Sequence, residues 1–333
     1  MRTLHVLTPT YKPVGGVVKI FDYVLHARSL GYEISVWSQF KVDPAGALFA
    51  QPQFRALLDD TGVRFHRRNA FEFGDDDLFF LSLPSNYQLA YANLPRHLSP
   101  ERIVHIIQNV RHVNPAWLAA QGSLVLTRPA ARISINQIVA DAIEPWLDPR
   151  GLHRVVNLGH QSSYFAKARS GGLGAPVRVG YTTWKSEVGT RVEDALVGRG
   201  FEFRAIRETA SWDELRELYH WADVFLSSPG PEEGMYLPGL EAMAAGCLVV
   251  TPDVGGNMAY CRPEQNCVLV GFESVPDYVA ALQRVAAASV AEVEALRAGG
   301  YAVVPEFDLD AERKGFAGFL DELWERVAHR EGR

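Results

Sequence analysis

Short apolar runs alternate with stretches of helical periodicity along this chain, and the alternation starts afresh near its middle. At the amino end, residues 3–9 predict a buried strand, residues 17–31 a helix closed by Gly31, and residues 33–37 a second strand. A strand, a helix and a strand in this order build a parallel sheet. Because the order restarts at residue 177, the sequence predicts an α/β protein with two doubly wound halves.

The remaining elements of each half follow from the same patterns. In the first half, strands are expected at residues 63–65, 77–82, 102–107, 124–126 and 132–134, followed by a helix at 136–147 and a closing segment at 155–165. In the second half, strands are expected at residues 177–181, 201–206, 223–227, 248–251 and 267–270. Helices are expected at residues 191–198, 238–245, 275–287, 291–297 and 311–327, and after the capping box formed by Ser211 and Glu214.

A glycine-rich stretch, residues 166–176, has the composition of a linker and separates the halves. A chain of 333 residues suits two domains of about 150 residues each. The expected organisation is an amino-terminal domain at residues 1–165, the linker at 166–176, a second domain at 177–310 and a terminal helix at 311–333.

Composition and charge exclude several classes of protein. The chain is 47% hydrophobic and 22% charged, which is typical of a globular protein, and no apolar run approaches the ~20 residues that span a bilayer. The net charge of -6 argues against nonspecific binding to nucleic acid, which needs a basic surface. We therefore expect neither a transmembrane segment nor a nucleic-acid partner.

The amino terminus and the cysteines favour a cytoplasmic location. A strand begins within residues 1–6, with no charged-then-apolar secretory leader before it. The three cysteines, Cys247, Cys261 and Cys267, are odd in number, contain no Cys-x2-Cys pair and adjoin no histidine cluster. They are interpreted as free thiols in a reducing cytoplasm.

The most informative motif lies between residues 228 and 246. It follows the apolar run at 223–227 and leads into a helix that has Pro238 in its first turn. A strand, a glycine-bearing loop and a helix start place backbone N–H groups and a helix dipole where phosphate oxygens bind. Glu233 in the loop and Glu241 in the helix repel phosphate but can accept hydrogen bonds from sugar hydroxyls. The motif therefore favours a ligand with phosphate and polyol parts, such as a nucleotide-sugar.

This string resembles a motif of the retaining glycosyltransferases of family 4, the group 1 glycosyltransferases that include glycogen-synthase-like and sucrose-synthase-like enzymes. Seven residues separate Glu233 from Glu241, and Glu-Ala-Met-Ala-Ala-Gly runs from Glu241 onward. The resemblance is strong over residues 222–256, moderate at Gly15-Gly16 and architectural elsewhere. It implies the GT-B fold: two Rossmann-like domains that face a central cleft, with a C-terminal helix that crosses back to the first domain.

The resemblance also implies roles for the residues of the motif. Glu233 lies against the donor sugar, and Glu241 holds the ribose of the nucleotide. The backbone of the loop holds the diphosphate, through Gly234, Met235, Tyr236 and Leu237.

Two glycine pairs are further candidates for ligand contacts. Gly15 and Gly16 follow the first strand, where an open α/β sheet binds ligands, and the family carries a Gly-Gly pair there. We expect this pair to let the backbone approach the donor diphosphate or the acceptor. Gly255-Gly256 matches another glycine segment of the family, and an ordinary glycine turn fits the sequence almost as well.

Positive charge is needed to stabilise a leaving diphosphate, and the family commonly supplies an arginine and a lysine after the first strand of the second domain. Lys185 matches the lysine. The usual place of the arginine holds Tyr181-Thr182 instead, which departs from the family pattern. The hydroxyls of Thr182 and Thr183 and the side chain of Arg191 are the candidates for contacts to the donor here.

Polar groups also gather at the end of a first-domain strand, at residues 105–114. Strand ends face the ligand crevice in this architecture, and many family members have a histidine near the donor sugar in this region. His112 is therefore a candidate catalytic residue, and Asn109 and Arg111 are candidates for the acceptor side. His105 lies within the strand and is expected to be a core histidine.

The acidic triplet Asp75-Asp76-Asp77 invites comparison with the metal-binding Asp-x-Asp of other glycosyltransferases. It precedes a strand instead of ending one, so it is interpreted as a turn. We expect no metal and no cofactor.

The expected function is transfer of a sugar from a nucleotide-diphosphate-sugar to an acceptor hydroxyl, with retention of anomeric configuration and without a metal. The resemblance implies that Glu233, Lys185 and His112 are the catalytic residues. The acceptor is expected to be a small molecule or a glycan. Two alternatives stay open: a GT-B nucleotide-sugar epimerase or phosphorolytic enzyme, and a non-catalytic nucleotide-sugar-binding module.

Overall fold

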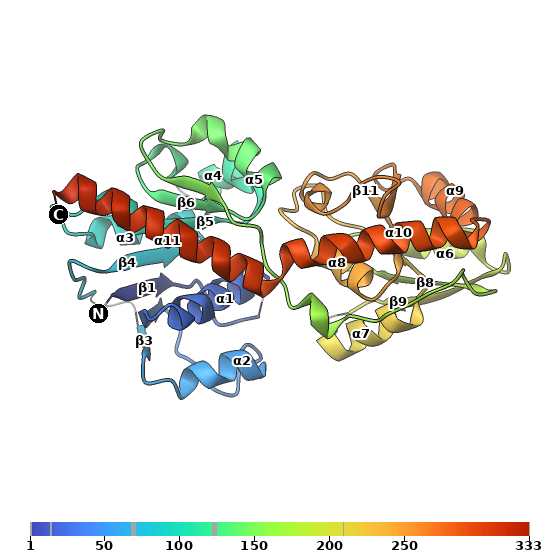
Figure 1. Ribbon diagram of the computed structural model, residues 1–333, viewed down its shortest axis with the longest axis horizontal. Helices are drawn as coiled ribbons and strands as arrows, with labels where there is room; N and C mark the ends of the chain where they lie inside the picture. The colour runs from blue at the N-terminus through green and yellow to red at the C-terminus, as the bar shows by residue number, and fades with distance from the viewer. Residues whose placement is uncertain (1, 14, 68–70, 122–124, 209, 333) are drawn as a thin grey trace. The chain divides into compact units, whose positions relative to one another are not determined.

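The computed structural model describes residues 2–13, 15–67, 71–121, 125–208 and 210–332, which form two compact units. The first unit comprises Met1–Asn157 and Glu312–Arg333, and the second comprises Leu158–Ala311. Each unit is built on one parallel β-sheet with helices packed against it (Figure 1). The expected α/β class with two doubly wound halves is confirmed.

The sheet of the first unit has seven strands in the order β3-β2-β1-β4-β5-β6-β7. These strands are β1 (Thr3–Leu7), β2 (Glu33–Ser38), β3 (Val63–Arg67), β4 (Leu78–Leu81), β5 (Ile103–Ile107), β6 (Ala131–Ser134) and β7 (His153–Val155). The strand order reverses between β1 and β4, so the loops that follow these two strands are neighbours. Open α/β sheets bind ligands at such a reversal, outside the carboxyl ends of the strands.

The helices of the first unit are α1 (Gly15–Ser29), α2 (Pro52–Arg55), α3 (Pro84–Asn93), α4 (Pro115–Gln121), α5 (Gln137–Ile143) and most of the long final helix α11 (Leu309–Glu331). Gly31 has a φ of +87°, the left-handed conformation expected of the residue that closes α1. No described helix, α11 included, is both long enough and apolar enough to cross a membrane.

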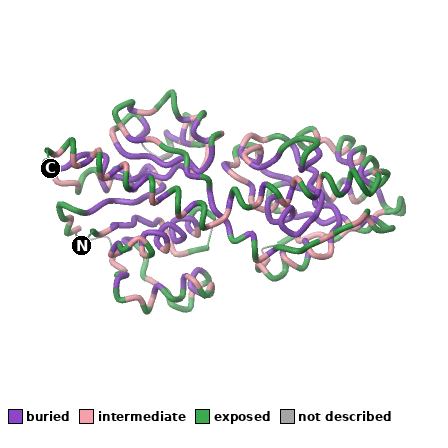
Figure 2. The backbone as a smooth tube through the Cα atoms, in the orientation of Figure 1, coloured by how far each residue is buried: buried purple, intermediate pink, exposed green. Residues whose placement is uncertain are grey.

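Buried residues are concentrated in the inner strands of each sheet, whereas exposed residues line the loops and the outer faces of the helices (Figure 2). β4, β5 and β6 are buried at every position. Parallel strands covered on both faces are mostly apolar, and β4 is apolar throughout, whereas β5 buries His105 and β6 buries Arg132 and Ser134.

A strand was expected at residues 124–126. This prediction is wrong at Val125 and Leu126, and Leu124 lies outside the described residues. Val125–Thr127 form a 3-10 helix. The buried Arg132 of β6 donates hydrogen bonds to the carbonyl oxygens of Val125 at 2.7 Å and of Arg128 at 2.8 Å. These carbonyls are therefore held in a turn, and β6 fills the place next to β5.

The sheet of the second unit has five strands in the order β12-β11-β10-β8-β9. These strands are β8 (Val177–Thr182), β9 (Phe201–Ile206), β10 (Val224–Leu226), β11 (Leu248–Pro252) and β12 (Cys267–Val270). The helices are α6 (Val188–Leu196), α7 (Trp212–Trp221), α8 (Leu237–Ala244), α9 (Val275–Ala286) and α10 (Val290–Val303). The predicted capping box of Ser211 and Glu214 is present at the start of α7.

Two helices of the second unit are longer than predicted, and glycine explains both cases. α6 begins at Val188, and a Cβ on Gly189 would lie 2.3 Å from the ring of Tyr181. α10 continues through Gly299, where a Cβ would lie 2.0 Å from the carbonyl oxygen of Gln265. Each glycine permits a close approach inside a helix, whereas the sequence pattern treats it as a break.

The compact units divide after Asn157, earlier than the linker expected at residues 166–176. That segment packs on the second unit. Arg169 donates hydrogen bonds to the backbone carbonyls of Tyr219 at 2.7 Å and of Ala245 at 2.9 Å, near the ends of α7 and α8. A basic side chain that satisfies helix-end carbonyls thus ties this glycine-rich segment to the rest of the second unit, of which it is part.

A buried cluster of charged side chains joins α11 to α1 within the first unit. Lys19 Nζ lies 2.8 Å from Asp22 Oδ2 and 2.9 Å from Glu312 Oε2. His26 Nε2 lies 2.9 Å from the same Glu312 oxygen. Burial lowers the pKa of Lys19, but the two carboxylates more than offset this and leave the pKa raised. The terminal helix is therefore anchored on the first unit, as expected.

The three cysteines are free and buried, and all of them belong to the second unit. Burial raises the pKa of Cys247 to about 11.

Candidate functional site

The motif singled out in the sequence folds as β10, a loop and α8. β10 is buried at all three residues, and α8 begins at Leu237 with Pro238 in its first turn. Tyr236 occupies the N-cap position, and its side chain makes no capping hydrogen bond to the first turn. The start of α8 therefore offers N–H groups and the positive end of a helix dipole to the loop.

This motif lies where the strand order of the second sheet reverses. β8 pairs with β9 on one side and with β10 on the other. The loop after β8, at residues 183–187, and the loop after β10, at residues 227–236, therefore start from neighbouring carboxyl ends. This is the place where open α/β sheets bind ligands.

Lys185 and Glu233 meet across this reversal. Lys185 Nζ lies 2.8 Å from Glu233 Oε1, with 49% of the lysine side chain and 22% of the glutamate side chain exposed. Both groups are thus accessible and neutralise each other. A phosphate can compete for the ammonium group, and a sugar hydroxyl can donate to the carboxylate. Two of the three side chains predicted to be catalytic are therefore in contact.

Thr182 reaches the same place from the end of β8. Its side chain is buried, and its Oγ1 lies 3.3 Å from the hydroxyl of Tyr236. Burial raises the pKa of Tyr236 to about 12, so the phenol stays protonated at neutral pH. The side chain of Tyr236 thus joins the start of α8 to the end of β8, a contact that the sequence did not reveal.

Tyr181 and Thr182 stand where the family arginine is expected, and the side chain of Tyr181 supports the fold. Its ring packs against Gly189 of α6, and its hydroxyl donates a hydrogen bond to Glu193. Arg207, just after β9, donates to the Tyr181 hydroxyl at 3.1 Å. The substitution therefore ties α6 and β9 to β8 and leaves Lys185 as the cation of the loop after β8.

Two other predicted donor contacts have partners elsewhere. The Thr183 hydroxyl donates to the carbonyl oxygen of Arg207 at 3.2 Å. Arg191 lies 3.3 Å from a carboxylate oxygen of Glu273. Among the described residues, neither side chain contacts the Lys185–Glu233 pair, and each has a partner on another loop.

Gly256 supports the loop that carries Glu233. A Cβ on Gly256 would lie 2.0 Å from the carbonyl oxygen of Glu233. The preceding Gly255 has a φ of +82°, a conformation that favours glycine. The glycine pair is therefore required for the close contact between two loops.

Replacing Gly256 with alanine is expected to destabilise the second unit by about 1–3 kcal/mol, because the added methyl group pushes two backbones apart. Thermal unfolding of the purified variant measures this effect. Gly318→Ala is the matched control: nothing lies within 4 Å of its Cβ position in α11, so alanine should leave stability unchanged or raise it by up to about 1 kcal/mol. Equal unfolding temperatures for Gly256→Ala and the parent would argue against the close contact.

Glu241 lies one turn into α8 and is buried, with both carboxylate oxygens engaged. His160 Nε2 lies 2.8 Å from Oε1, and the Tyr219 hydroxyl donates to Oε2 at 2.8 Å. Burial and the neighbouring Glu241 raise the pKa of Tyr219 well above its usual value, so it remains a donor. Neither partner was predicted from the sequence. The available signal was a glutamate on an otherwise apolar helix, which requires a partner when buried.

In the first unit, Gly15 and Gly16 begin α1 beside the reversal between β1 and β4. The Cβ position of Gly15 faces open space, and that of Gly16 lies 3.4 Å from Gln108 Oε1. Gln108 Nε2 donates to the Gly16 carbonyl at 3.0 Å and to Ser82 Oγ at 3.1 Å. The loops after β1, β4 and β5 therefore meet, through a glutamine that the sequence did not single out.

His112 is buried. Its ring centroid lies 4.9 Å from that of Trp117 and 5.5 Å from that of His105. Burial lowers the pKa of His112 to about 4, so the imidazole is neutral at pH 7. Its Nε2 has no hydrogen-bond partner among the described residues. A neutral ring of this kind can form one further hydrogen bond but carries no positive charge.

The other polar residues of this region have structural contacts. Asn109 Oδ1 accepts a hydrogen bond from the Arg111 N–H at 3.0 Å and starts a short 3-10 turn that leaves Arg111 exposed. His105 is buried in β5, with Nε2 3.1 Å from the Ser82 carbonyl oxygen, which confirms it as a core histidine.

The acidic triplet forms the predicted turn before β4. The carboxylate of Asp77 accepts hydrogen bonds from the backbone N–H groups of Gly74 at 2.7 Å and of Thr3 at 3.1 Å. His5 Nε2 lies 3.1 Å from the same carboxylate. Asp77 thus fixes the turn to the start of the sheet.

Part of the second unit matches the model of a known protein family. Residues 180–288 match the family model described as Glycosyl transferases group 1. The match runs from β8 to α9 and contains Lys185, Glu233 and Glu241. This segment resembles group 1 glycosyl transferases. No curated protein matches the chain.

Solved glycosyltransferase structures share the fold of nearly the whole chain. A glycosyltransferase from Rickettsia africae matches with a TM-score of 0.68 and 13% identity, over 97% of this chain and 98% of that one. HepE of Anabaena, in complex with UDP and glucose, matches with a TM-score of 0.66 and 14% identity, over 96% and 99%. Sucrose-phosphate synthase from Thermosynechococcus elongatus gives 0.66 and 14%, over 98% and 100%. These likenesses establish the fold as GT-B.

Proposed function

We propose that the protein is a metal-independent glycosyltransferase that moves a sugar from a nucleotide-diphosphate-sugar to an acceptor hydroxyl with retention of anomeric configuration. The observation that carries the proposal is the Lys185–Glu233 pair, 2.8 Å apart, beside the start of α8 in the segment that resembles group 1 glycosyl transferases. The lysine, the N–H groups and the helix dipole suit a diphosphate, and the carboxylate suits sugar hydroxyls. HepE, a structural relative, is solved with UDP and glucose, which supports a donor of this class.

In the proposed reaction, the bond between the sugar C1 and the leaving phosphate oxygen breaks, and a bond from C1 to the acceptor oxygen forms on the same face. The acceptor proton passes to the leaving phosphate oxygen. Lys185 and the N–H groups at the start of α8 stabilise the negative charge that develops on the diphosphate. Glu233 orients the sugar, so catalysis comes from positioning and charge stabilisation.

The remaining assignments divide between the units. In the second unit, the backbone at residues 234–237 holds the diphosphate and Glu241 holds the ribose. In the first unit, we propose that the acceptor binds at the reversal between β1 and β4. The first-unit residues assigned to substrate are Gly15, Gly16, Asn109, Arg111 and His112, the last as a neutral hydrogen-bonding group. We also propose that the enzyme is cytoplasmic, because its three cysteines are free and buried, as in proteins of a reducing compartment.

Binding of the correct nucleotide is expected to raise the unfolding temperature by about 5–10 °C at a concentration near 100 times Kd, which corresponds to about 2.7 kcal/mol. UDP, GDP, ADP and their sugar conjugates would be screened by thermal unfolding in buffer that contains a chelator. Lys185→Ala should abolish most of the shift. Absence of any shift, together with absence of sugar transfer, would reject the proposal.

The donor that passes this screen is then incubated with small-molecule and glycan acceptors. Proton NMR of the product distinguishes retention from inversion at the anomeric carbon. Conversion of the donor without an acceptor would instead favour an epimerase or phosphorolytic enzyme, and binding without any turnover would favour a binding module.

A further inference from the structure

We propose that His160, together with Tyr219, is a positioning residue that holds the carboxylate of Glu241 in the orientation that receives the ribose hydroxyls of the donor. This inference rests on the proposed function, which assigns Glu241 to the ribose. Neither His160 nor Tyr219 belongs to the motif that identifies the site.

The two contacts fix the plane of the carboxylate. His160 Nε2 meets Oε1 at 2.8 Å and the Tyr219 hydroxyl meets Oε2 at 2.8 Å, so each oxygen has one partner. A carboxylate has about four acceptor positions, two on each oxygen. One position therefore remains on each oxygen of Glu241, which suits two neighbouring hydroxyls of a ribose.

His160 is itself held by contacts that do not involve Glu241. Its backbone N–H donates to the Phe307 carbonyl at 2.8 Å. Its ring stacks on Phe165 with centroids 5.8 Å apart and meets the Trp212 ring edge-on at 5.5 Å. Because the backbone and the ring are both fixed, Nε2 is in place before Glu241 binds any ligand.

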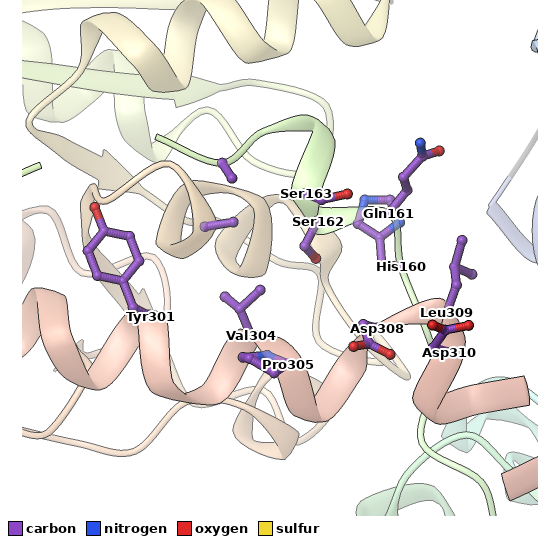
Figure 3. A pocket seen from close by; sticks show the side chains of 12 residues that line it. His160, Gln161, Ser162, Ser163, Tyr301, Val304, Pro305, Asp308, Leu309 and Asp310 are labelled. Atoms are coloured by element: carbon purple, nitrogen blue, oxygen red, sulfur yellow. The ribbon is translucent and has the colours of Figure 1, made fainter. Parts of the chain in front are cut away.

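His160 also lies on the wall of a cavity of about 440 Å³ (Figure 3). Another part of this wall comes from the end of α10 and the following turn, at Tyr301 and Val304, whereas Asp308 lies beside His160. Because the cavity already borders the imidazole, truncation of His160 enlarges an existing space instead of creating a sealed void in the core. Variants at His160 are therefore suited to a binding experiment.

Burial explains why the orientation of Glu241 depends on these donors. Glu241 is 4% exposed and sits on a helix whose neighbouring residues are apolar. A buried carboxylate without donors turns toward other partners or takes up a proton, because desolvation of an unpaired charge is unfavourable. Loss of His160 is therefore expected to act on the ribose contact and much less on the diphosphate contact.

The test compares ribose and deoxyribose forms of one nucleotide. Calorimetric titration of the full chain with UDP, GDP and ADP identifies the nucleotide that binds, and its 2′-deoxy and 3′-deoxy forms are then titrated. We expect the parent to prefer the ribose form about tenfold. His160→Ala should reduce this preference to about twofold or less, while the affinity for the deoxy forms changes by less than about threefold.

Two variants confirm or overturn the positioning role. His160→Gln keeps an N–H donor and should restore most of the ribose preference, whereas Tyr219→Phe should lower it as His160→Ala does. His220→Ala is the matched control: its Nε2 lies 3.0 Å from the Phe165 carbonyl oxygen, next to Tyr219 on α7, and its loss should leave the preference unchanged. Equal weakening of ribose and deoxyribose forms in His160→Ala would overturn the proposal, because a purely structural role predicts that result.

Glu241→Ala separates this inference from the proposed function. If Glu241→Ala keeps the ribose preference, the assignment of Glu241 to the ribose is wrong, and the positioning role fails with it. If Glu241→Ala loses the preference but His160→Ala keeps it, the proposed function stands and only the role of His160 is rejected.

Discussion

Replacing Glu233 with alanine is expected to lower the turnover of sugar transfer about 100- to 1,000-fold, while donor affinity changes by less than about tenfold. In the free protein Glu233 is paired with Lys185 at 2.8 Å. Removal of the carboxylate deletes the contact that orients the sugar but leaves the lysine available to the diphosphate. The loss should therefore appear in kcat and much less in the binding of the nucleotide-sugar.

Steady-state kinetics and calorimetric titration of Glu233→Ala measure the two quantities separately. Glu232→Ala is the matched control, because it removes an acid that is exposed on the same loop. It should change both quantities by less than about threefold. Full turnover in the Glu233 variant would remove this residue from the proposed mechanism.

The second large effect concerns stability. Replacing Glu312 with glutamine is expected to lower the free energy of unfolding of the first unit by about 3 kcal/mol, the lower end of the range for breaking a buried ion pair. The Glu312 side chain is fully buried between Lys19 and His26. Lys19 keeps Asp22 as a partner at 2.8 Å, which limits the loss.

Urea unfolding and hydrogen exchange of the α11 amides measure the effect of Glu312→Gln. Glu322→Gln on the same helix is the control, because its partner Arg154, 2.8 Å away, is about half exposed. An exposed pair of this kind contributes about 0–1 kcal/mol. If both variants lose the same stability, the buried cluster does not anchor α11.

Much of the fold follows from local sequence, because buried parallel strands are short and uniformly apolar. β4 and β10 illustrate this, since each is apolar and buried throughout and each was placed within about one residue of its observed position. The same applies to the start of α8, where Pro238 marks the first turn. The loop at residues 227–236 connects β10 to α8 and therefore lies where the strand order of the second sheet reverses. The position of Glu233, at the centre of the site, was thus also predictable.

The elements that were missed lack these local signals. α2 and α4 are short, and α3 has no regular apolar stripe. The start of α6 and the end of α10 were missed. Gly189 in α6 and Gly299 in α10 are each needed for a contact with a distant part of the chain. A local pattern cannot distinguish a glycine that breaks a helix from one that lets another element come close.

The partners of site residues were the least predictable part. Tyr181 in the place of an arginine was visible in the sequence, but its contacts with Glu193 and Arg207 depend on how α6 and β9 pack on β8. His160 and Glu241 lie 81 positions apart in the sequence. Such pairs are set by the tertiary arrangement of whole elements, and no periodicity in the sequence records them.

The location of the cysteine thiols allows unfolding of one half of this chain to be observed separately from unfolding of the other. Cys247, Cys261 and Cys267 all lie within the second unit and are all shielded from solvent. A thiol-reactive dye therefore labels the protein only when that unit opens, and it does not respond to unfolding confined to the other half. Labelling rates recorded with and without a nucleotide would thus assign any gain in protection to one half of the molecule, without dividing the chain.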